Sequence, residues 1–192
     1  MIVVFNAIDL ALSWNPSNFS FNPDDKYELV WQDEFEDAGP VKVIINRQPS
    51  YAPNPKSWGY IIGVHHDDGI ENYTDSIYNA YVQNNQLTIV AMKERYTSAM
   101  LTAENLQEFT FGVFAAKICL PYGKGIWSAW WMYGDDHQTG LSWSTVGEID
   151  TLEMWGGSEM ANYRDQYAHG TVHWNNQSNT MHPVYNKYIG KP

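Results

Sequence analysis

The chain has 192 residues, enough for one domain with a hydrophobic core and too few for two ordinary domains. Eleven Lys and Arg residues against 22 Asp and Glu residues give a net charge of −11, which disfavours nucleic acid or an anionic membrane as a partner. The single cysteine, Cys119, excludes an internal disulfide and a zinc site built from cysteines. No apolar stretch approaches the roughly 20 residues of a membrane span.

The chain begins with an apolar segment, residues 1–11, which Asn6 and Asp9 interrupt. A secretory signal has a basic start and an unbroken apolar run, and this segment has neither. The segment is therefore a poor candidate for a secretory signal, and a signal remnant and a first strand are the alternatives.

Most of the sequence is typical of short β-strands separated by turns. Residues 86–92 and 109–120 are rich in β-branched and aromatic residues, and clusters of Gly, Pro, Asn and Asp recur between such runs. Residues 102–108 are the one candidate for a helix, with a connecting loop as the alternative. Because strands and helices do not alternate, the pattern predicts a single all-β domain, a sandwich of two antiparallel sheets.

A tryptophan-rich strand is predicted over residues 125–133 (GIWSAWWMY). Side chains alternate along a strand, so Trp127 and Trp131 share one face and Trp130 lies on the other. Tryptophan rings stack on the apolar faces of sugars, which makes the first two candidates for a carbohydrate surface. For Trp130 we expect packing in the core.

The strongest chemical motif is EIDTLE, which begins at Glu148. On a regular strand Asp150 would share the face of Glu148, and Glu153 would point to the opposite side, where an unpaired charge is costly. One extra residue, a β-bulge between Asp150 and Glu153, returns all three acids to one face. The apolar Ile149 and Leu152 are then predicted to face the core.

Three carboxylates on one strand face permit three interpretations. The Cα atoms of Glu148 and Glu153 would lie on the order of 13 Å apart at about 3.3 Å per residue. Their side chains can lean together toward the roughly 5–5.5 Å separation of a retaining glycosidase, where like charges raise one pKa and Asp150 tunes the pair. Clustered carboxylates also bind calcium, and a solvated strand face is the third interpretation. Spacing alone leaves all three open.

The order of several segments then resembles a known family. The motif EIDTLE looks like the signature E-x-D-x-x-E of glycoside hydrolase family 16 in its bulged, laminarinase-type form. Residues 29–35 resemble the family's opening strand, and residues 125–132 resemble its G-x-W-P-A-x-W-M segment. Residues 170–174 resemble the strand that follows the catalytic one, so the resemblance runs from about residue 27 to residue 174.

The resemblance implies an all-β jelly-roll sandwich of two antiparallel sheets with a concave substrate cleft. It divides the chain into an N-terminal extension, residues 1–26, and a catalytic domain, residues 27–192, that is incomplete at its C-terminus. Family members continue with several more strands, whereas residues 175–192 have little strand pattern. Three explanations stay open: a fragment of a longer enzyme, missing strands supplied by another chain, or a sandwich that closes differently.

The same resemblance assigns roles to individual residues. Glu148 would be the nucleophile, Glu153 the acid and base, and Asp150 the group that assists Glu148 electrostatically. The implied substrate-binding residues are Trp127, Trp131, His173, Asn72, Trp143 and Trp155. For His173, a purely structural role on its strand is the alternative. No cofactor is expected to be required and no metal ligand is assigned, although the family implies a structural calcium ion whose ligands are not identified.

The implied function is a retaining endo-1,3(4)-β-glucanase, which hydrolyses β-1,3- or mixed β-1,3/1,4-glucans by double displacement with two glutamates. One alternative is a β-glucan-binding module with little or no activity, and another is a structural domain in which the acids hold calcium. The expected partner is a β-glucan polysaccharide or oligosaccharide, together with a partner chain or C-terminal segment that completes the sandwich. The expected location is extracellular or associated with the cell wall.

Overall fold

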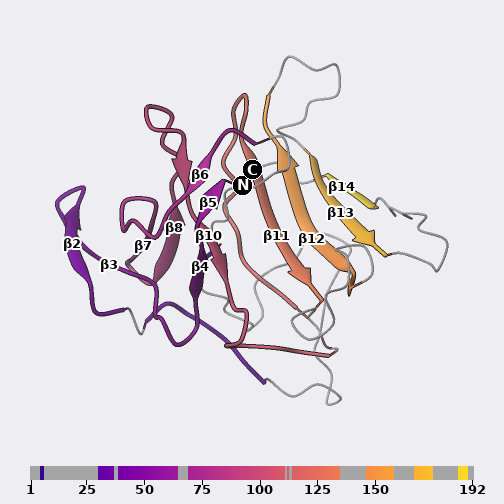
Figure 1. The fold of residues 1–192 in the computed structure, drawn as a ribbon, viewed down its shortest axis with the longest axis horizontal. Helices are drawn as coiled ribbons and strands as arrows, with labels where there is room; N and C mark the ends of the chain where they lie inside the picture. Colours follow the sequence, from indigo (N-terminus) through magenta and orange to yellow (C-terminus); the bar gives the residue numbers. More distant parts are fainter. Residues whose placement is uncertain are drawn as a thin grey trace.

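A computed structural model of the chain describes residues 5–6, 30–36, 39–64, 69–110, 112, 114–134, 146–157, 167–174 and 186–189. These residues form strands β1 to β14, which hydrogen bonding divides into four sheets (Figure 1). The predicted all-β fold is confirmed, and the predominantly antiparallel sheets agree with a jelly-roll sandwich. No helix among the described residues is long and apolar enough to cross a bilayer.

The largest sheet has five antiparallel strands in the order β1-β8-β7-β3-β2. Their bounds are Phe5–Asn6 for β1, Gln86–Ile89 for β8, Ala80–Gln83 for β7, Gln48–Tyr51 for β3 and Lys42–Ile45 for β2. Two-residue turns close its two hairpins. Asn46 and Arg47 have φ angles of 51° and 66°, and Asn84 and Asn85 have 52° and 57°. Left-handed residues of this kind are what a tight hairpin requires, and asparagine tolerates them better than most residues.

Two small sheets lie between the larger ones in Figure 1. One pairs β4 (Gly59–Ile61) with β10 (Met100–Thr102), and the other contains β5 (Gly63–Val64), β6 (Asn72–Tyr73) and β9 (Thr97–Ser98), with β6 and β9 parallel. Only Ile62 separates β4 from β5, and only Ala99 separates β9 from β10. These single residues interrupt two runs of strand that are otherwise continuous along the chain, and they separate the two small sheets.

The candidate helix at residues 102–108 is a connecting loop. Thr102 ends β10, and the amides of Leu106 and Gln107 both bond to the carbonyl of Ala103, which makes a single turn. Asn105 within that turn has a φ angle of 58°. The turn does not continue as a helix because a left-handed residue cannot propagate right-handed helical geometry.

The fourth sheet has four antiparallel strands in the order β11-β12-β13-β14 (Figure 1). Their bounds are Trp127–Tyr133 for β11, Glu148–Trp155 for β12, Tyr167–His173 for β13 and Asn186–Ile189 for β14. The last strand lies in the segment whose sequence has little strand pattern. It forms because its backbone pairs with β13, and such pairing overrides weak local preference.

The core lies against one face of β11. Its buried members are Phe35, Ala80, Val82, Leu87, Ile89 and Ala99, and Trp130 packs against this cluster from β11. The prediction that Trp130 is a core residue is therefore confirmed. Trp127 and Trp131 consequently point to the opposite face of the sheet.

The prediction that Ile149 faces the core is wrong. Its side chain is 46% exposed, and its neighbour in register on β13, Val172, is 39% exposed. Leu152, which lies opposite Trp130, is partly buried. Ile149 is more exposed than Leu152 because of its position along β12. The core cluster packs near Trp130 and Leu152, and no described residue covers the sheet near Ile149.

Candidate active site

The predicted β-bulge is present on β12. Against β13, Asp150 lies opposite Thr171 and Glu153 lies opposite His169, so three steps on β12 match two on β13. Against β11, the pairing skips Thr151, whose side chain is exposed. A bulge of this kind puts two residues opposite one and reverses which face the following side chains occupy.

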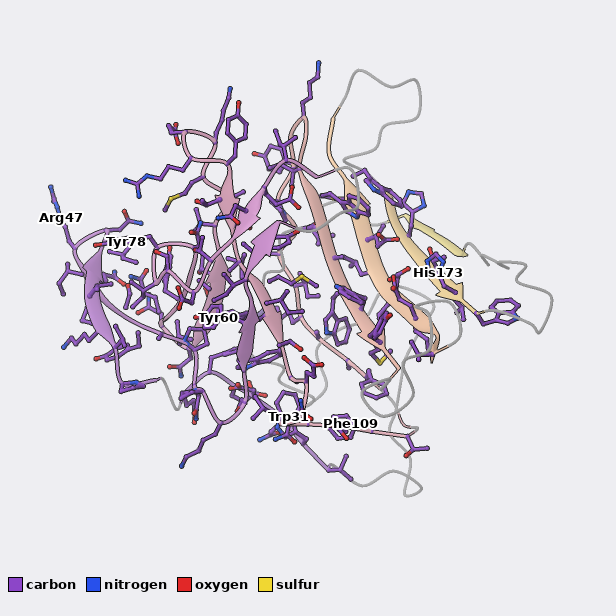
Figure 2. The ribbon with its side chains drawn as sticks, viewed as in Figure 1. Trp31, Arg47, Tyr60, Tyr78, Phe109 and His173 are labelled. Atoms are coloured by element: carbon purple, nitrogen blue, oxygen red, sulfur yellow. The ribbon has the colours of Figure 1, made fainter. Side chains whose placement is uncertain are left out.

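The bulge places the three acids on one face of the sheet, between two strands that add further side chains to it. In register, Glu148 lies opposite Tyr133 on β11 and His173 on β13, whereas Glu153 lies opposite Ala129 and His169. The residues that share this face with the acids are Trp127, Ala129, Trp131, Tyr133, Trp155, His169, Thr171 and His173. We name this surface the acidic face. Figure 2 shows its member His173 far from Arg47, which lies in the turn between β2 and β3.

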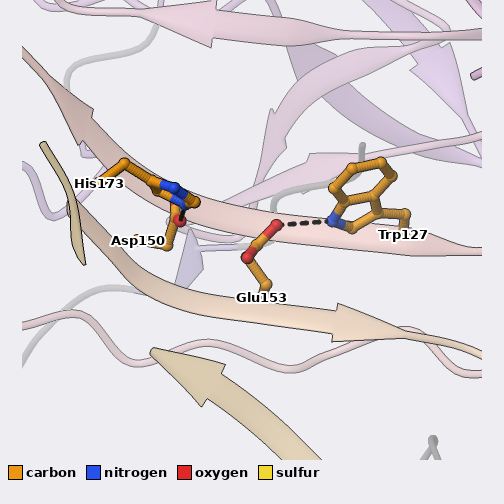
Figure 3. Close-up of polar contacts among 4 residues, drawn as sticks. All are labelled: Trp127, Asp150, Glu153 and His173. Atoms are coloured by element: carbon orange, nitrogen blue, oxygen red, sulfur yellow. Dashed lines mark hydrogen bonds and ion pairs between the residues drawn. The ribbon is translucent and has the colours of Figure 1, made fainter. Parts of the chain in front are cut away.

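Asp150 is joined to a histidine of the neighbouring strand. Its Oδ2 atom lies 2.9 Å from Nε2 of His173, and Asp150 is only 4% exposed (Figure 3). Burial raises the pKa of Asp150 to about 8, with further contributions from the charges of Glu153 and Glu148 and a hydrogen bond with Glu148. Asp150 is therefore neutral at pH 7, and its hydroxyl is able to donate to the Glu148 carboxylate.

The tautomer of His173 is linked to the position of the Asp150 proton. With that proton directed at Glu148, Oδ2 of Asp150 accepts in the contact and the Nε2–H tautomer of His173 donates. The resulting chain runs from His173 through Asp150 to Glu148. It stabilises the negative charge of Glu148 without placing a second full charge beside it.

Glu153 is bonded to a tryptophan. The Nε1–H group of Trp127 donates to Oε1 of Glu153 at 2.9 Å, and Glu153 is 9% exposed (Figure 3). The pKa of Glu153 is raised overall, mainly by burial and further by the charge of Glu148. The hydrogen bond from Trp127 and the charge of His173 act in the opposite direction and lower it. A carboxylic acid whose pKa is raised toward neutrality is suited to donating a proton in a reaction.

Aromatic side chains flank the acids at both ends of the acidic face. Trp131 and Tyr133 contact each other edge to face, with ring centroids 5.9 Å apart, near Asp150 and Glu148. At the Glu153 end, the rings of Trp127 and Trp155 lie 5.8 Å apart. The acidic face therefore has the composition of a sugar-binding surface, with ring faces on either side of the carboxylates.

Among the described residues, the structure brings the predicted site residues together except one, Asn72. Asn72 is exposed on β6, in a different sheet, and no contact among the described residues joins it to the acids. Trp143 lies outside the described residues. The functional role of each predicted site residue remains a prediction.

Sequence reasoning missed His169 and Thr171. The ring of His169 contacts Trp155 edge-on, with centroids 4.8 Å apart, and Thr171 lies opposite Asp150 with 3% exposure. The signal was available in the alternation of the sequence HGTVH, because residues at positions 169, 171 and 173 must share the face of His173.

Glu148, Asp150 and His173 also form a candidate metal-ligand set, since one ligand atom from each lies within 4.8 Å of the others. Calcium takes six to eight oxygen ligands, whereas this set offers two carboxylates and a nitrogen. The donor set therefore does not fit calcium. The structural calcium ion implied by the resemblance remains a prediction without identified ligands.

Comparison with known proteins agrees with the geometry. The sequence model of the family described as "Glycosyl hydrolases family 16" matches residues 70–189. The chain is 35% identical over 156 residues to a beta-glucanase from Rhodothermus marinus, covering 77% of this chain and 48% of that protein. It is 29% identical over 163 residues to glucan endo-1,3-beta-glucosidase A1 from Niallia circulans, covering 78% and 22%.

A third relative is a glucan endo-1,3-beta-glucosidase from Cryptopygus antarcticus, with 27% identity over 157 residues, covering 76% of this chain and 50% of that protein. The chain thus spans about half, or less, of the length of these relatives. The matched family region, residues 70–189, contains the whole acidic face.

Proposed function

The chain belongs to glycosyl hydrolases family 16, and we propose that it is a retaining endo-glycosidase that hydrolyses β-1,3- or mixed β-1,3/1,4-glucans. The observation that carries this proposal is the bulge on β12, which puts Glu148, Asp150 and Glu153 on one face between flanking tryptophans. The names of the similar proteins, beta-glucanase and glucan endo-1,3-beta-glucosidase, support the same substrate class.

In the first step, a carboxylate oxygen of Glu148 attacks the anomeric carbon of the sugar. The bond from that carbon to the leaving oxygen breaks, and Glu153 gives its proton to this oxygen. A covalent glycosyl ester of Glu148 and a shortened glucan with a free hydroxyl result. The raised pKa of Glu153 supports its role as the acid, because the group must hold a proton near neutral pH.

In the second step, water attacks the same carbon from the face that the leaving group vacated. Glu153, now a carboxylate, accepts a proton from this water, and the ester bond to Glu148 breaks. Two inversions give net retention at the anomeric carbon, and both glutamates return to their starting states.

Asp150 and His173 act on Glu148 in this mechanism. A neutral Asp150 donates a hydrogen bond to the Glu148 carboxylate while it accepts one from His173. This bond favours Glu148 as the leaving carboxylate in the second step, when negative charge returns to its oxygen. We therefore assign Asp150 and His173 to the electrostatic support of the nucleophile.

The test compares the wild-type protein with Glu148→Gln and Glu153→Gln on laminarin and on mixed-linkage glucan, measuring new reducing ends. We expect Glu148→Gln to lower kcat by on the order of 10³-fold or more, and Glu153→Gln by about 10²–10⁴-fold. Glu94→Gln, which changes an exposed acid away from the acidic face, is the matched control and should retain full activity.

Product stereochemistry gives a second test of the mechanism. Proton NMR of the first product should show the β-anomer before mutarotation, as retention requires. Initial formation of the α-anomer would contradict double displacement. Wild-type protein that binds laminarin without hydrolysing it would instead support a β-glucan-binding module.

We also propose that the protein acts outside the cell or at the cell wall, because a polymeric glucan cannot cross a membrane to reach a cytoplasmic enzyme. Fractionation of the source cells, followed by immunoblotting of medium, wall and cytoplasm, tests this location. Detection in the cytoplasmic fraction alone would contradict it.

A further inference from the structure

We propose that Trp127 is a positioning residue for Glu153, and that its indole N–H group dictates which carboxyl oxygen delivers the proton to the leaving group. The inference rests on the proposed role of Glu153 as the acid. It changes the role of Trp127, which its sequence position suggested to be a sugar-stacking platform.

The first argument is the use of the indole donor. Trp127 has one side-chain N–H group, and that group donates to Oε1 of Glu153 at 2.9 Å (Figure 3). When Glu153 is protonated, Oε1 is the acceptor of this bond, so the hydroxyl hydrogen resides on Oε2. The transferred proton therefore leaves from Oε2, and Trp127 cannot offer the same N–H group to a sugar hydroxyl.

The second argument is the small residue on β11 that lies opposite Glu153. Ala129 occupies that position and is 3% exposed. A larger side chain would occupy the space over which Glu153 reaches Trp127, two residues earlier on β11. Alanine leaves room for this diagonal contact, which is within the reach of long side chains across neighbouring strands.

The third argument is the support behind the indole. Trp127 lies opposite Trp155 in register, with their rings 5.8 Å apart, and Trp155 contacts His169 at 4.8 Å. His169 itself lies opposite Glu153. The ring of Trp127 therefore packs in a row with those of Trp155 and His169, which limits the orientations open to its N–H group.

The chemical effect of the bond has a definite sign. An N–H group that donates to a carboxylate favours its ionised form, and the bond from Trp127 opposes the increase that burial causes in the pKa of Glu153. Removing the donor should raise the pKa of Glu153. The alkaline limb of the kcat/KM profile, where the acid loses its proton, should then move to higher pH.

Trp127→Phe is the decisive variant, since it keeps an aromatic ring against Trp155 and removes the N–H group. We expect kcat/KM on laminarin to fall about tenfold and the alkaline limb to rise by about one pH unit. On a 2,4-dinitrophenyl β-laminarioligosaccharide, whose leaving group needs no proton, kcat/KM should change less than about twofold.

Trp155→Phe is the matched control, because Trp155 shares the ring contact but makes no described hydrogen bond with Glu153. It should change kcat/KM for both substrates by the same factor and leave the alkaline limb in place. If Trp127→Phe behaved in the same way, with equal losses on both substrates and no shift of the limb, Trp127 would be a sugar platform and the inference would be overturned.

A measurement on wild-type protein tests the inference even if Trp127→Phe does not fold. With ¹⁵N-labelled indoles, one Nε1–H resonance of wild-type protein should titrate with the midpoint of the alkaline limb, and Glu153→Gln should abolish that titration. Absence of any such resonance would overturn the inference while leaving the hydrolytic function intact. Wild-type protein without hydrolytic activity on either substrate would overturn the proposed function and this inference together.

Discussion

The Nε2 atom of His173 lies 2.9 Å from Oδ2 of Asp150, across the boundary between β13 and β12. The contact joins a strand histidine to the most buried acid of the acidic face, which sits 4% exposed between Glu148 and Glu153. Because the pKa of Asp150 is raised to about 8, its carboxyl holds a proton at pH 7, and this contact is a hydrogen bond rather than an ion pair. Several consequences for activity and stability can be measured.

A neutral Asp150 should be replaceable by asparagine more readily than by alanine. In Asp150→Asn, the amide N–H group takes over donation to Glu148, and the amide oxygen takes over acceptance from His173. We expect kcat/KM on laminarin to remain within about tenfold of wild type, and to fall about 10²-fold or more in Asp150→Ala, which loses both bonds. Equal losses in the two variants would show that Asp150 must carry a charge.

The raised pKa of Asp150 also predicts how stability depends on pH. The pKa is 3.8 in an unperturbed carboxyl and about 8 in the fold. Between about pH 4 and pH 8 the folded state therefore retains a proton that the unfolded state has released, and stability falls as pH rises through this window. Asp150→Asn removes this dependence.

Thermal unfolding of wild type and Asp150→Asn at pH 4, 6 and 8 checks this sign. The gain in Tm of the variant over wild type should be near zero at pH 4 and should increase as the pH rises to 8. A gain that is the same at all three values would contradict a proton held by Asp150.

The bulge makes an unusual prediction for a deletion. Removing Thr151 leaves the order Glu148, Ile149, Asp150, Leu152, Glu153, which alternates regularly and still puts all three acids on one face. We expect this variant to fold and to retain measurable hydrolysis.

Deleting Ile149 is the control for the loss of one residue from β12. It places Asp150 on the face of the strand opposite Glu148, so activity should fall at least as far as in Asp150→Ala. Circular dichroism and assays on laminarin compare the two deletions. If deleting Thr151 abolished activity in a folded protein, the separation of Glu148 and Glu153, and not only their common face, would be essential.

The residue directly before β12 is a glycine with a left-handed backbone conformation. Gly147, directly before Glu148, has a φ angle of 86°, a conformation that costs other residues about 1–2 kcal/mol. Gly147→Ala should lower the free energy of unfolding by that amount in urea titrations. Gly59→Ala is the control, since an added methyl there would meet Thr102 at an ordinary 3.5 Å and no left-handed φ is present. Equal effects of the two changes would contradict a conformational origin.

The parts of the site that depend on side-chain alternation could be predicted from the sequence. The bulge follows from the cost of burying the charge of Glu153 on the core face of the strand. The core position of Trp130 follows from side-chain alternation, which puts it on the face opposite Trp127. The bond between Trp127 and Glu153 could not be predicted in this way. It joins residues 26 apart in sequence, and only the register of β11 on β12 sets that contact.

Features that depend on what lies outside a strand were harder to predict. Ile149 has the apolar character of a core residue, but burial depends on which end of the sheet the core cluster reaches. The strand at residues 186–189 is specified by its partner β13 and not by its own composition. The position of His169 could have been predicted, since side-chain alternation puts it on the same face of the strand as His173.

The position of β12 within its sheet has one more consequence. Because β11 and β13 bond to its two edges, the backbone beneath Glu148 and Glu153 has little freedom to move. The free energy needed to crowd these carboxylates together is supplied once, when the chain folds, and not again in each turnover. In the proposed reaction the two glutamates on β12 are thus preorganised, and the glucan adopts the conformation that fits them.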